Sequence, residues 1–161
     1  MKIILKLMFV GLLGSVFVPN RAEAQNGPED LNLKLKLLLP KTAFVFRGTV
    51  HEITKTNIKF CQVDILKNNT QKNIETNKNC LLFPLEQEQY PSVDTPVFMK
   101  EREYILFVSY SRDPYVFTAM TTYGLYRIIN GLVYDYFGDV VLNSQHEQVD
   151  VNYFIEKTRQ K

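Results

Sequence analysis

An Asn-Gly pair, Asn130-Gly131, joins two runs of aliphatic and aromatic residues, 125–129 and 132–136, and limits how this chain can fold more than any other feature. Both central residues of a tight two-residue turn need a positive φ, which Asn and Gly adopt readily, so this pattern predicts a β-hairpin. The expected register pairs Ile129 with Leu132 and Ile128 with Val133. The latter part of the chain is therefore expected to be β-sheet.

Strand patterns recur upstream of this hairpin. In the strand that begins after Ala43, one face carries Phe44, Phe46, Gly48 and Val50, and the other carries Val45, Arg47, Thr49 and His51. Residues 104–108 are apolar on both faces, as expected of a central strand. The other expected strands are 58–66, 80–83 and 115–122, whereas three prolines indicate a loop over 85–96.

Helices are expected on both sides of the strands. Leu31, Leu33, Leu35 and Leu37 alternate with polar residues as in a strand, but Leu and Lys favour helices and Pro28-Glu29-Asp30 is typical of a helix start. Helix is the preferred interpretation there. Near the end of the chain, Asp150 can cap a short helix with Val151, Phe154 and Ile155 on one face. We therefore predict a mainly β fold, a small antiparallel OB-like or Greek-key barrel of five to seven strands, with an N-terminal helical segment and a short C-terminal helix.

Residues 1–24 are typical of a signal peptide. Lys2 and Lys6 precede an apolar stretch over 7–18, and Ala22-Glu23-Ala24 matches a small-x-small cleavage site. The apolar stretch is shorter than the roughly 20 residues of a membrane span, although an uncleaved anchor is the alternative. We expect the mature chain to begin at Gln25 and to form a single exported domain, 25–161, that is secreted or periplasmic and has no transmembrane segment.

The charge balance argues against nucleic acid as a partner. The predicted leader holds three of the 19 basic residues and one of the 17 acidic residues, which leaves 16 of each in the mature chain. Binding to a phosphate backbone depends on several Lys or Arg contacts and usually on a basic patch. The mature sequence is neutral and shows no run of Lys and Arg.

Two cysteines remain after the leader, Cys61 and Cys80. An even number of cysteines in an exported chain indicates a disulfide, and their spacing differs from the Cys-x-x-Cys of a redox pair, which is the alternative. Between them lies a polar stretch that has little apolar surface to bury, so a covalent link at its ends is expected to be structural. Asn68-Asn69-Thr70 also matches the N-glycosylation pattern, which makes Asn68 a candidate acceptor.

The sequence shows no arranged catalytic or metal-binding residues and no cofactor motif. The two histidines, His51 and His146, are expected to be exposed, and no serine lies in a Gly-x-Ser-x-Gly motif. Neither a His-x-x-x-His pair nor a calcium-loop spacing occurs, and the glycines of the mature chain are too scattered for a phosphate-binding loop. We therefore expect no catalytic residue, no metal and no cofactor.

Tyrosine is enriched late in the chain, with seven of the nine between residues 104 and 136. Tyr combines a large rigid ring with a hydroxyl group and is common at recognition surfaces, although it also fills small β cores and their rims. The residues we predict for a binding face are Arg47, Tyr115, Tyr126 and Tyr134.

The order of these elements resembles the netrin-like domains, which include the tissue inhibitors of metalloproteinases. The matching features are Ala43-Phe44-Val45-Phe46-Arg47-Gly48-Thr49-Val50, the strand with Val63 and Ile65, Glu103-Tyr104-Ile105-Leu106-Phe107 and the Asn130-Gly131 hairpin, over about 110 residues. The resemblance implies a secreted OB-type barrel of five strands with flanking helices. Inhibitors of that family chelate the zinc of their target with an N-terminal cysteine. Here the expected N-terminus is Gln25, so this activity is not carried over.

Taken together, the residues favour an exported, non-catalytic binding or interaction module whose partner is a protein or a carbohydrate. An exported hydrolase without a recognisable motif is one alternative, and a structural component of an envelope assembly is another. Two close carboxylates with a raised pKa would favour the hydrolase, whereas a long unpaired edge strand would favour assembly by strand addition.

Overall fold

An antiparallel sheet with a helix before it and a helix after it forms the described part of the chain. The computed structural model describes residues 30–70, 73–74, 76–84, 98–110, 117–119 and 124–160. The predicted signal peptide, Gln25, the expected loop over 85–96 and Tyr115 lie outside these residues. The elements in chain order are α1 (Leu31–Leu38), η1 (Leu39–Lys41), β1 (Phe44–Ile53), β2 (Asn57–Asn68), β3 (Cys80–Pro84), β4 (Glu103–Tyr110), β5 (Phe117–Ala119), β6 (Leu125–Ile129), β7 (Leu132–Tyr134) and α2 (Val151–Gln160).

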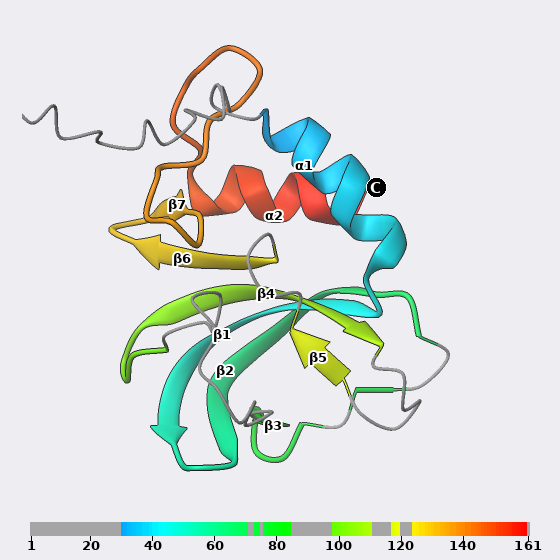
Figure 1. The fold of residues 1–161 in the computed structure, drawn as a ribbon, viewed down its shortest axis with the longest axis vertical. Helices are drawn as coiled ribbons and strands as arrows, with labels where there is room; N and C mark the ends of the chain where they lie inside the picture. The colour runs from blue at the N-terminus through cyan, green and yellow to red at the C-terminus, as the bar shows by residue number, and fades with distance from the viewer. Residues whose placement is uncertain are drawn as a thin grey trace, which may run out of the picture.

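The strands lie in the order β3-β2-β1-β4-β6-β7, and β5 pairs with β4. The first four strands form a Greek key, because β1, β2 and β3 are consecutive neighbours and β4 returns beside β1. Figure 1 shows β1 to β5 curving together, with β6, β7 and both helices gathered at the other end of the molecule. This arrangement confirms the predicted mainly β class, with one helix before the strands in the sequence and one after them. Among the described strands the ladder is not closed, since β3 and β7 do not pair.

Strand β4 and the first part of β1 are buried on both faces because each face covers a different core. The first, which we call the helix-side core, lies under α1 and α2 and includes Val45, Ile105, Phe107 and Phe154. The second, the inner core, lies within the curve of the strands and is built from Ala43, Phe44, Phe46, Val50, Ile58, Phe60, Phe83, Tyr104, Leu106, Val108 and Leu125. Alternate residues of one strand thus enter different cores, as period-two geometry requires. The expected apolar faces of both strands are confirmed.

The β6–β7 hairpin has the predicted turn and register. Asn130 has a φ of 51° and Gly131 a φ of 79°, so both central residues are left-handed. Ile128 lies opposite Val133 and Ile129 lies opposite Leu132. The local sequence is therefore sufficient to specify this hairpin.

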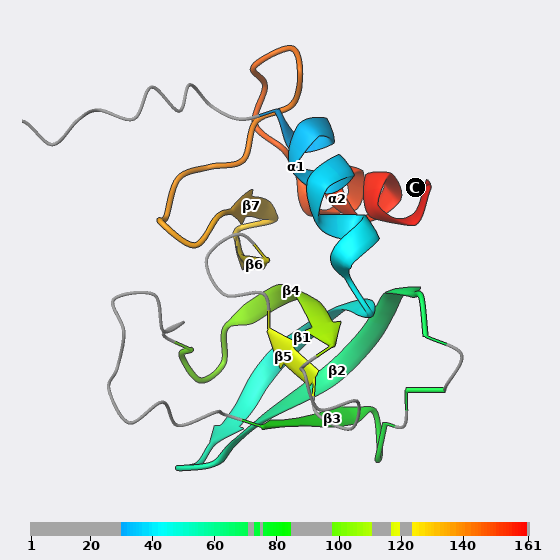
Figure 2. The same cartoon turned by 45° about the vertical axis from the view of Figure 1, so that its right-hand side comes forward.

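Helix α1 resolves the choice between strand and helix for the leucine-rich segment. The Asp30 side chain caps its start by accepting a hydrogen bond from the Asn32 backbone N–H at 2.9 Å. Leu31, Leu35 and Leu38 face the helix-side core. The α-helix ends before Pro40, which lies in the short 3-10 turn η1. Figure 2 shows α1 in front of α2, with both helices on the same side of the sheet.

Helix α2 begins at the predicted cap. Asp150 Oδ1 accepts hydrogen bonds from the backbone N–H groups of Asn152 at 2.8 Å and Tyr153 at 3.0 Å. Phe154 and Ile155 are buried in the helix-side core, and Val151 packs against it. The predicted apolar face of this helix is therefore confirmed.

Replacing Asp150 with alanine is expected to lower the free energy of unfolding by about 1 kcal/mol, because two N–H groups at the start of α2 lose their acceptor. Equilibrium urea unfolding followed by circular dichroism measures this change. The control is Asp150→Ser, which retains a capping oxygen and should lose clearly less. Equal losses in the two variants would contradict a capping role for the Asp150 side chain.

Candidate functional site

The structure does not bring the predicted binding residues together on one face. Tyr126 is 1% exposed and belongs to the helix-side core, which corrects the expectation that its ring lies on a binding surface. Its ring centroid is 5.7 Å from that of Phe107 and 4.8 Å from that of Phe154. Tyr134 lies opposite Arg127 and next to the buried Val133, so it points to the other face of the sheet.

Arg47 is half-buried and forms an ion pair within the sheet. Its Nε donates to Glu103 Oε1 at 2.6 Å, and both side chains are about one-third exposed. The guanidinium group therefore already has a carboxylate partner across the β1–β4 pairing. Tyr134 is also partly exposed, and its ring has no close aromatic neighbour among the described residues. Tyr115 lies outside the described part of the chain.

The predicted disulfide is present between Cys61 and Cys80. These residues lie directly opposite each other on β2 and β3, with Cα atoms 4.0 Å apart. The chain returns between the two strands through Lys78 and Asn79, whose φ angles are both positive. The disulfide thus links the two ends of the polar connection between β2 and β3, as the sequence analysis predicts.

Asn68 ends β2 and is exposed. Its Oδ1 accepts hydrogen bonds from the backbone N–H of Thr70 at 2.9 Å and from the Thr70 hydroxyl at 2.6 Å. The predicted glycosylation acceptor therefore lies on the surface, between Lys67 and Asn69. Its modification remains a prediction.

Helix α1 exposes two leucines on the side that faces away from the sheet. Leu33 is 50% exposed and Leu37 is 60% exposed. They are four residues apart, so they are neighbours on the helix surface and form an apolar ridge, which we call the α1 ridge. Lys36 is three residues from Leu33, and Pro40 is three residues from Leu37, so both lie beside this ridge.

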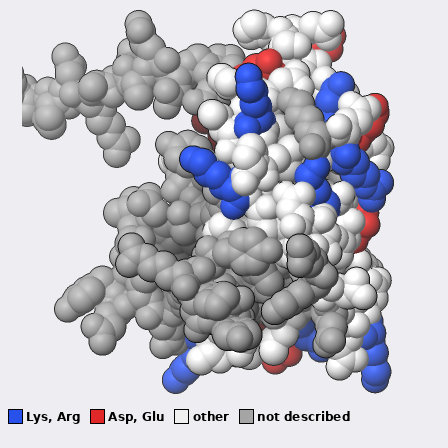
Figure 3. All heavy atoms as spheres, turned by 90° about the vertical axis from the view of Figure 1, so that its right-hand side faces the viewer, with Lys and Arg blue, Asp and Glu red and all other residues white. Residues whose placement is uncertain are grey.

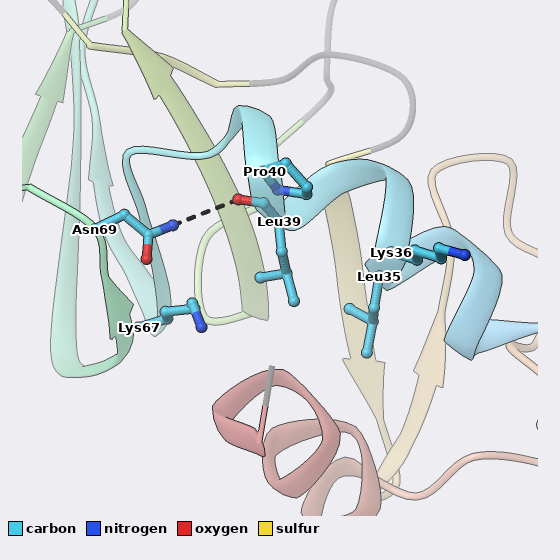
Figure 4. A pocket seen from close by; sticks show the side chains of 6 residues that line it. All are labelled: Leu35, Lys36, Leu39, Pro40, Lys67 and Asn69. Carbon is cyan, nitrogen blue, oxygen red and sulfur yellow. Dashed lines mark hydrogen bonds between the residues drawn. The ribbon is translucent and has the colours of Figure 1, made fainter.

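A groove next to the ridge, which we call the α1 groove, has a volume of about 340 Å³. It lies between α1 with η1 and the end of β2. Its lining residues are Leu35, Lys36, Leu39, Pro40, Lys67 and Asn69. In Figure 4, Leu35 and Leu39 point into the space above α2, Lys67 lies on the opposite wall, and Lys36 points along the outside of the helix.

The wall formed by the end of β2 is tied to the turn that follows α1. The Asn69 side-chain amide donates to the carbonyl oxygens of Thr42 at 2.9 Å and of Leu39 at 3.4 Å. The Asn69 backbone N–H also donates to the carbonyl of Ala43 at 2.8 Å. These bonds hold Lys67 and Leu39 at a set separation, so the groove is already formed without a ligand.

Some of the cations near the α1 groove form ion pairs and others do not. Lys34, on another side of α1, pairs with Asp135 at 3.6 Å, and Arg159 of α2 pairs with Asp64 at 3.0 Å. Within the described residues, Lys36 and Lys67 form no ion pair. Figure 3 shows Lys and Arg side chains over the upper part of the view, interspersed with Asp and Glu, and further Lys and Arg side chains at its lower edge. Lys67 borders the groove, Lys36 points outward from α1, and Leu35 and Leu39 beneath the groove are 0% and 5% exposed.

Neither of the two histidines lines the α1 groove. His51 lies exposed on β1, and His146 lies exposed in the segment before α2. Within the described ranges, no group of three or more His, Cys, Asp or Glu is close enough to hold a metal ion. Neither of the described helices has the length and apolar character that a bilayer crossing requires.

Comparison with protein-family models, curated proteins and solved structures finds no match to this chain. The function of the α1 ridge is therefore inferred from the residues that form it. The sequence contained a signal for it, because a helix that buries Leu31 and Leu35 must place Leu33 and Leu37 on its opposite side. Lys67 carried no such signal, since its position beside α1 depends on the path of β2.

Proposed function

We propose that this protein is an exported, non-catalytic binding module that contacts its partner through the α1 ridge and the α1 groove. The observation that carries this proposal is the exposure of two neighbouring leucines, Leu33 and Leu37, on the outer side of α1. Contiguous apolar surface next to a polar rim is typical of interaction sites on folded proteins. Lys36 lies beside this apolar surface and forms no ion pair within the described residues, so it can contribute to selecting the partner by charge.

The covalent structure supports an extracellular setting for this module. The Cys61–Cys80 disulfide fits an oxidising compartment. Cleavage of residues 1–24 and secretion or periplasmic location are part of the proposal. So is the relationship to netrin-like domains, for which the Greek-key order of β1 to β4 is a supporting observation.

The test is partner capture by the exported protein, immobilised and exposed with a chemical cross-linker to the extracellular or periplasmic fraction of its source. We expect one discrete partner, and at least tenfold less of it on a Leu33→Gln/Leu37→Gln variant. Gln has a helix propensity close to that of Leu, so α1 should remain folded. The matched control is Leu82→Gln/Met99→Gln, which changes two similarly exposed apolar residues elsewhere.

Capture by the control variant at the wild-type level supports the α1 ridge as the contact surface. Equal loss in both double variants would show a general effect of surface polarity and would contradict this site. Absence of any discrete partner, or substrate turnover by the purified protein, would overturn the proposed function itself.

A further inference from the structure

The Cys61–Cys80 disulfide lies where a thiol of another protein can reach it. We infer that this bond is a thiol–disulfide exchange site, which a dithiol oxidoreductase opens in the folded protein by attacking Cys80 Sγ and releasing Cys61 as a thiolate. This inference goes beyond the proposed function, because it concerns another end of the sheet and a chemical change in the chain itself. Its basis is the position of the bond on the outer face of an edge strand.

The face of the sheet that carries the disulfide is open to solvent. Phe60 of β2 and Phe83 of β3 enter the inner core, so the residues next to them along each strand, among them Cys61, point to the other face. Cys80 and Leu82 share this outer face on β3. Leu82 is 64% exposed, and both cysteines are half-buried. Figure 1 shows both helices at the opposite end of the molecule from β3, so neither helix covers the bond.

The two sulfur atoms differ in the direction from which a thiolate can attack them. Exchange proceeds by attack of a thiolate on one sulfur, in line with the S–S bond, and gives a mixed disulfide. The bond runs from β2 to β3, so an in-line approach to Cys61 comes from the side of β1, where Thr49 lies directly opposite. An approach to Cys80 comes from beyond β3, which among the described strands pairs with β2 alone. Cys80 is therefore the sulfur that is attacked, and Cys61 is the leaving group.

A cation lies beside the leaving group. Lys59 is two residues before Cys61 on β2, so both side chains lie on the outer face of the strand, and Lys59 is half-buried. A positive charge close to a cysteine stabilises its thiolate, and a more stable thiolate leaves a disulfide faster. The same strand thus supplies the leaving group and a charge that favours its departure.

The exchange balances when the reductant is a dithiol. The first thiolate of the partner bonds to Cys80 Sγ as the Sγ–Sγ bond breaks, and the electron pair of that bond stays on Cys61 Sγ, which takes up a proton. The second thiol of the partner loses its proton and attacks the partner's sulfur in the mixed disulfide, and Cys80 leaves as a thiolate that is then protonated. Two electrons and two protons thus pass to the cysteines from the dithiol, which becomes a disulfide. Strand β3 is afterwards held by noncovalent contacts alone.

The test compares reduction of the exported, disulfide-bonded protein by dithiothreitol in native buffer and in guanidinium chloride. Iodoacetamide traps the free thiols, and mass spectrometry counts them. We expect the native rate to be no more than about a hundredfold below that of the unfolded chain, and to rise in proportion to dithiothreitol, because the reagent attacks the folded protein directly. A bond reached through global unfolding alone would be reduced more than about a thousandfold more slowly, since the unfolded fraction is that small. A difference above a hundredfold, or a rate that stops rising with dithiothreitol, would overturn the inference.

A trapping experiment identifies the sulfur that is attacked. The probe is thioredoxin in which serine replaces the second cysteine of the Cys-x-x-Cys motif, so that the mixed disulfide is not resolved. Peptide mapping of the trapped complex should find thioredoxin bonded to Cys80. A complex through Cys61, or no complex with the folded protein, would overturn the inference.

A charge variant tests the leaving group. Lys59→Gln should slow native reduction by about threefold, because the thiolate of Cys61 loses a neighbouring positive charge. The matched control is Lys41→Gln, which makes the same change in charge at an exposed lysine of η1 and should keep the wild-type rate. Thermal unfolding followed by circular dichroism verifies that both variants are folded. Equal rates in Lys59→Gln and the wild type would overturn the assignment of Cys61 as the leaving group.

Discussion

Replacing Phe154 with alanine is expected to lower the free energy of unfolding by about 3–5 kcal/mol. Phe154 is completely buried, and its ring centroid lies 4.8 Å from that of Tyr126 and 6.3 Å from that of Phe107. Truncation removes the transfer free energy of the ring and leaves a cavity where α2 meets β4 and β6. Since a domain is stable by about 5–15 kcal/mol in total, this one change should bring the protein close to unfolding at room temperature.

Urea unfolding followed by circular dichroism at 25 °C measures this loss. The matched control is Phe137→Ala, because Phe137 is 65% exposed and its removal leaves no buried cavity. The control should change the free energy of unfolding by no more than about 0.5 kcal/mol. Similar small losses in both variants would show that α2 does not contribute a ring to the helix-side core.

Loss of the Cys61–Cys80 disulfide is expected to lower the free energy of unfolding by about 3 kcal/mol. The two cysteines are 19 residues apart, and closing a loop of about 20 residues stabilises by that amount in the chain-entropy model. The effect should be concentrated at β3, because among the described strands β3 pairs with β2 alone. Without the covalent bond, the polar connection between these strands has little to hold its ends together.

The measurement compares urea unfolding of the oxidised protein, the protein in reductant and a Cys61→Ser/Cys80→Ser variant. Reduced protein and the variant should show the same loss, and reductant should not change the variant further. Hydrogen exchange should increase first at the backbone N–H groups of β3. An unchanged free energy of unfolding after reduction would contradict a stabilising role.

The strand predictions succeeded where the local pattern specified the environment of each residue. Both turn residues of Asn130-Gly131 adopt positive φ with the expected pairing, and Phe44 and Phe46 enter one core while Val45 enters the other. Alternation in a strand identifies which residues share a face without reference to the rest of the chain. The disulfide was predictable for a different reason, since two cysteines permit a single pairing.

The predicted binding face failed at Tyr126 because composition does not report exposure. Enrichment in tyrosine is compatible with a surface or with a core, and at Tyr126 the outcome depended on where α2 packs. Arg47 was likewise expected on an outer face. Its side chain is about one-third exposed, but Glu103 on β4 provides its partner. Both outcomes follow from pairings between segments that are far apart in the sequence.

By itself, the sequence determined the Asn130-Gly131 hairpin, the capped helix that begins after Asp150, the apolar faces of the main strands, and which cysteines are bonded. These properties depend on neighbours within a few residues, through backbone periodicity, turn conformation and capping. The tertiary structure alone decided that the end of β2 lies beside α1, so that Lys67 and Leu39 line one groove. The reason is that the hydrophobic effect brings distant apolar faces together without direction. The pattern within one segment therefore does not predict which residues of another segment will lie beside its polar side chains.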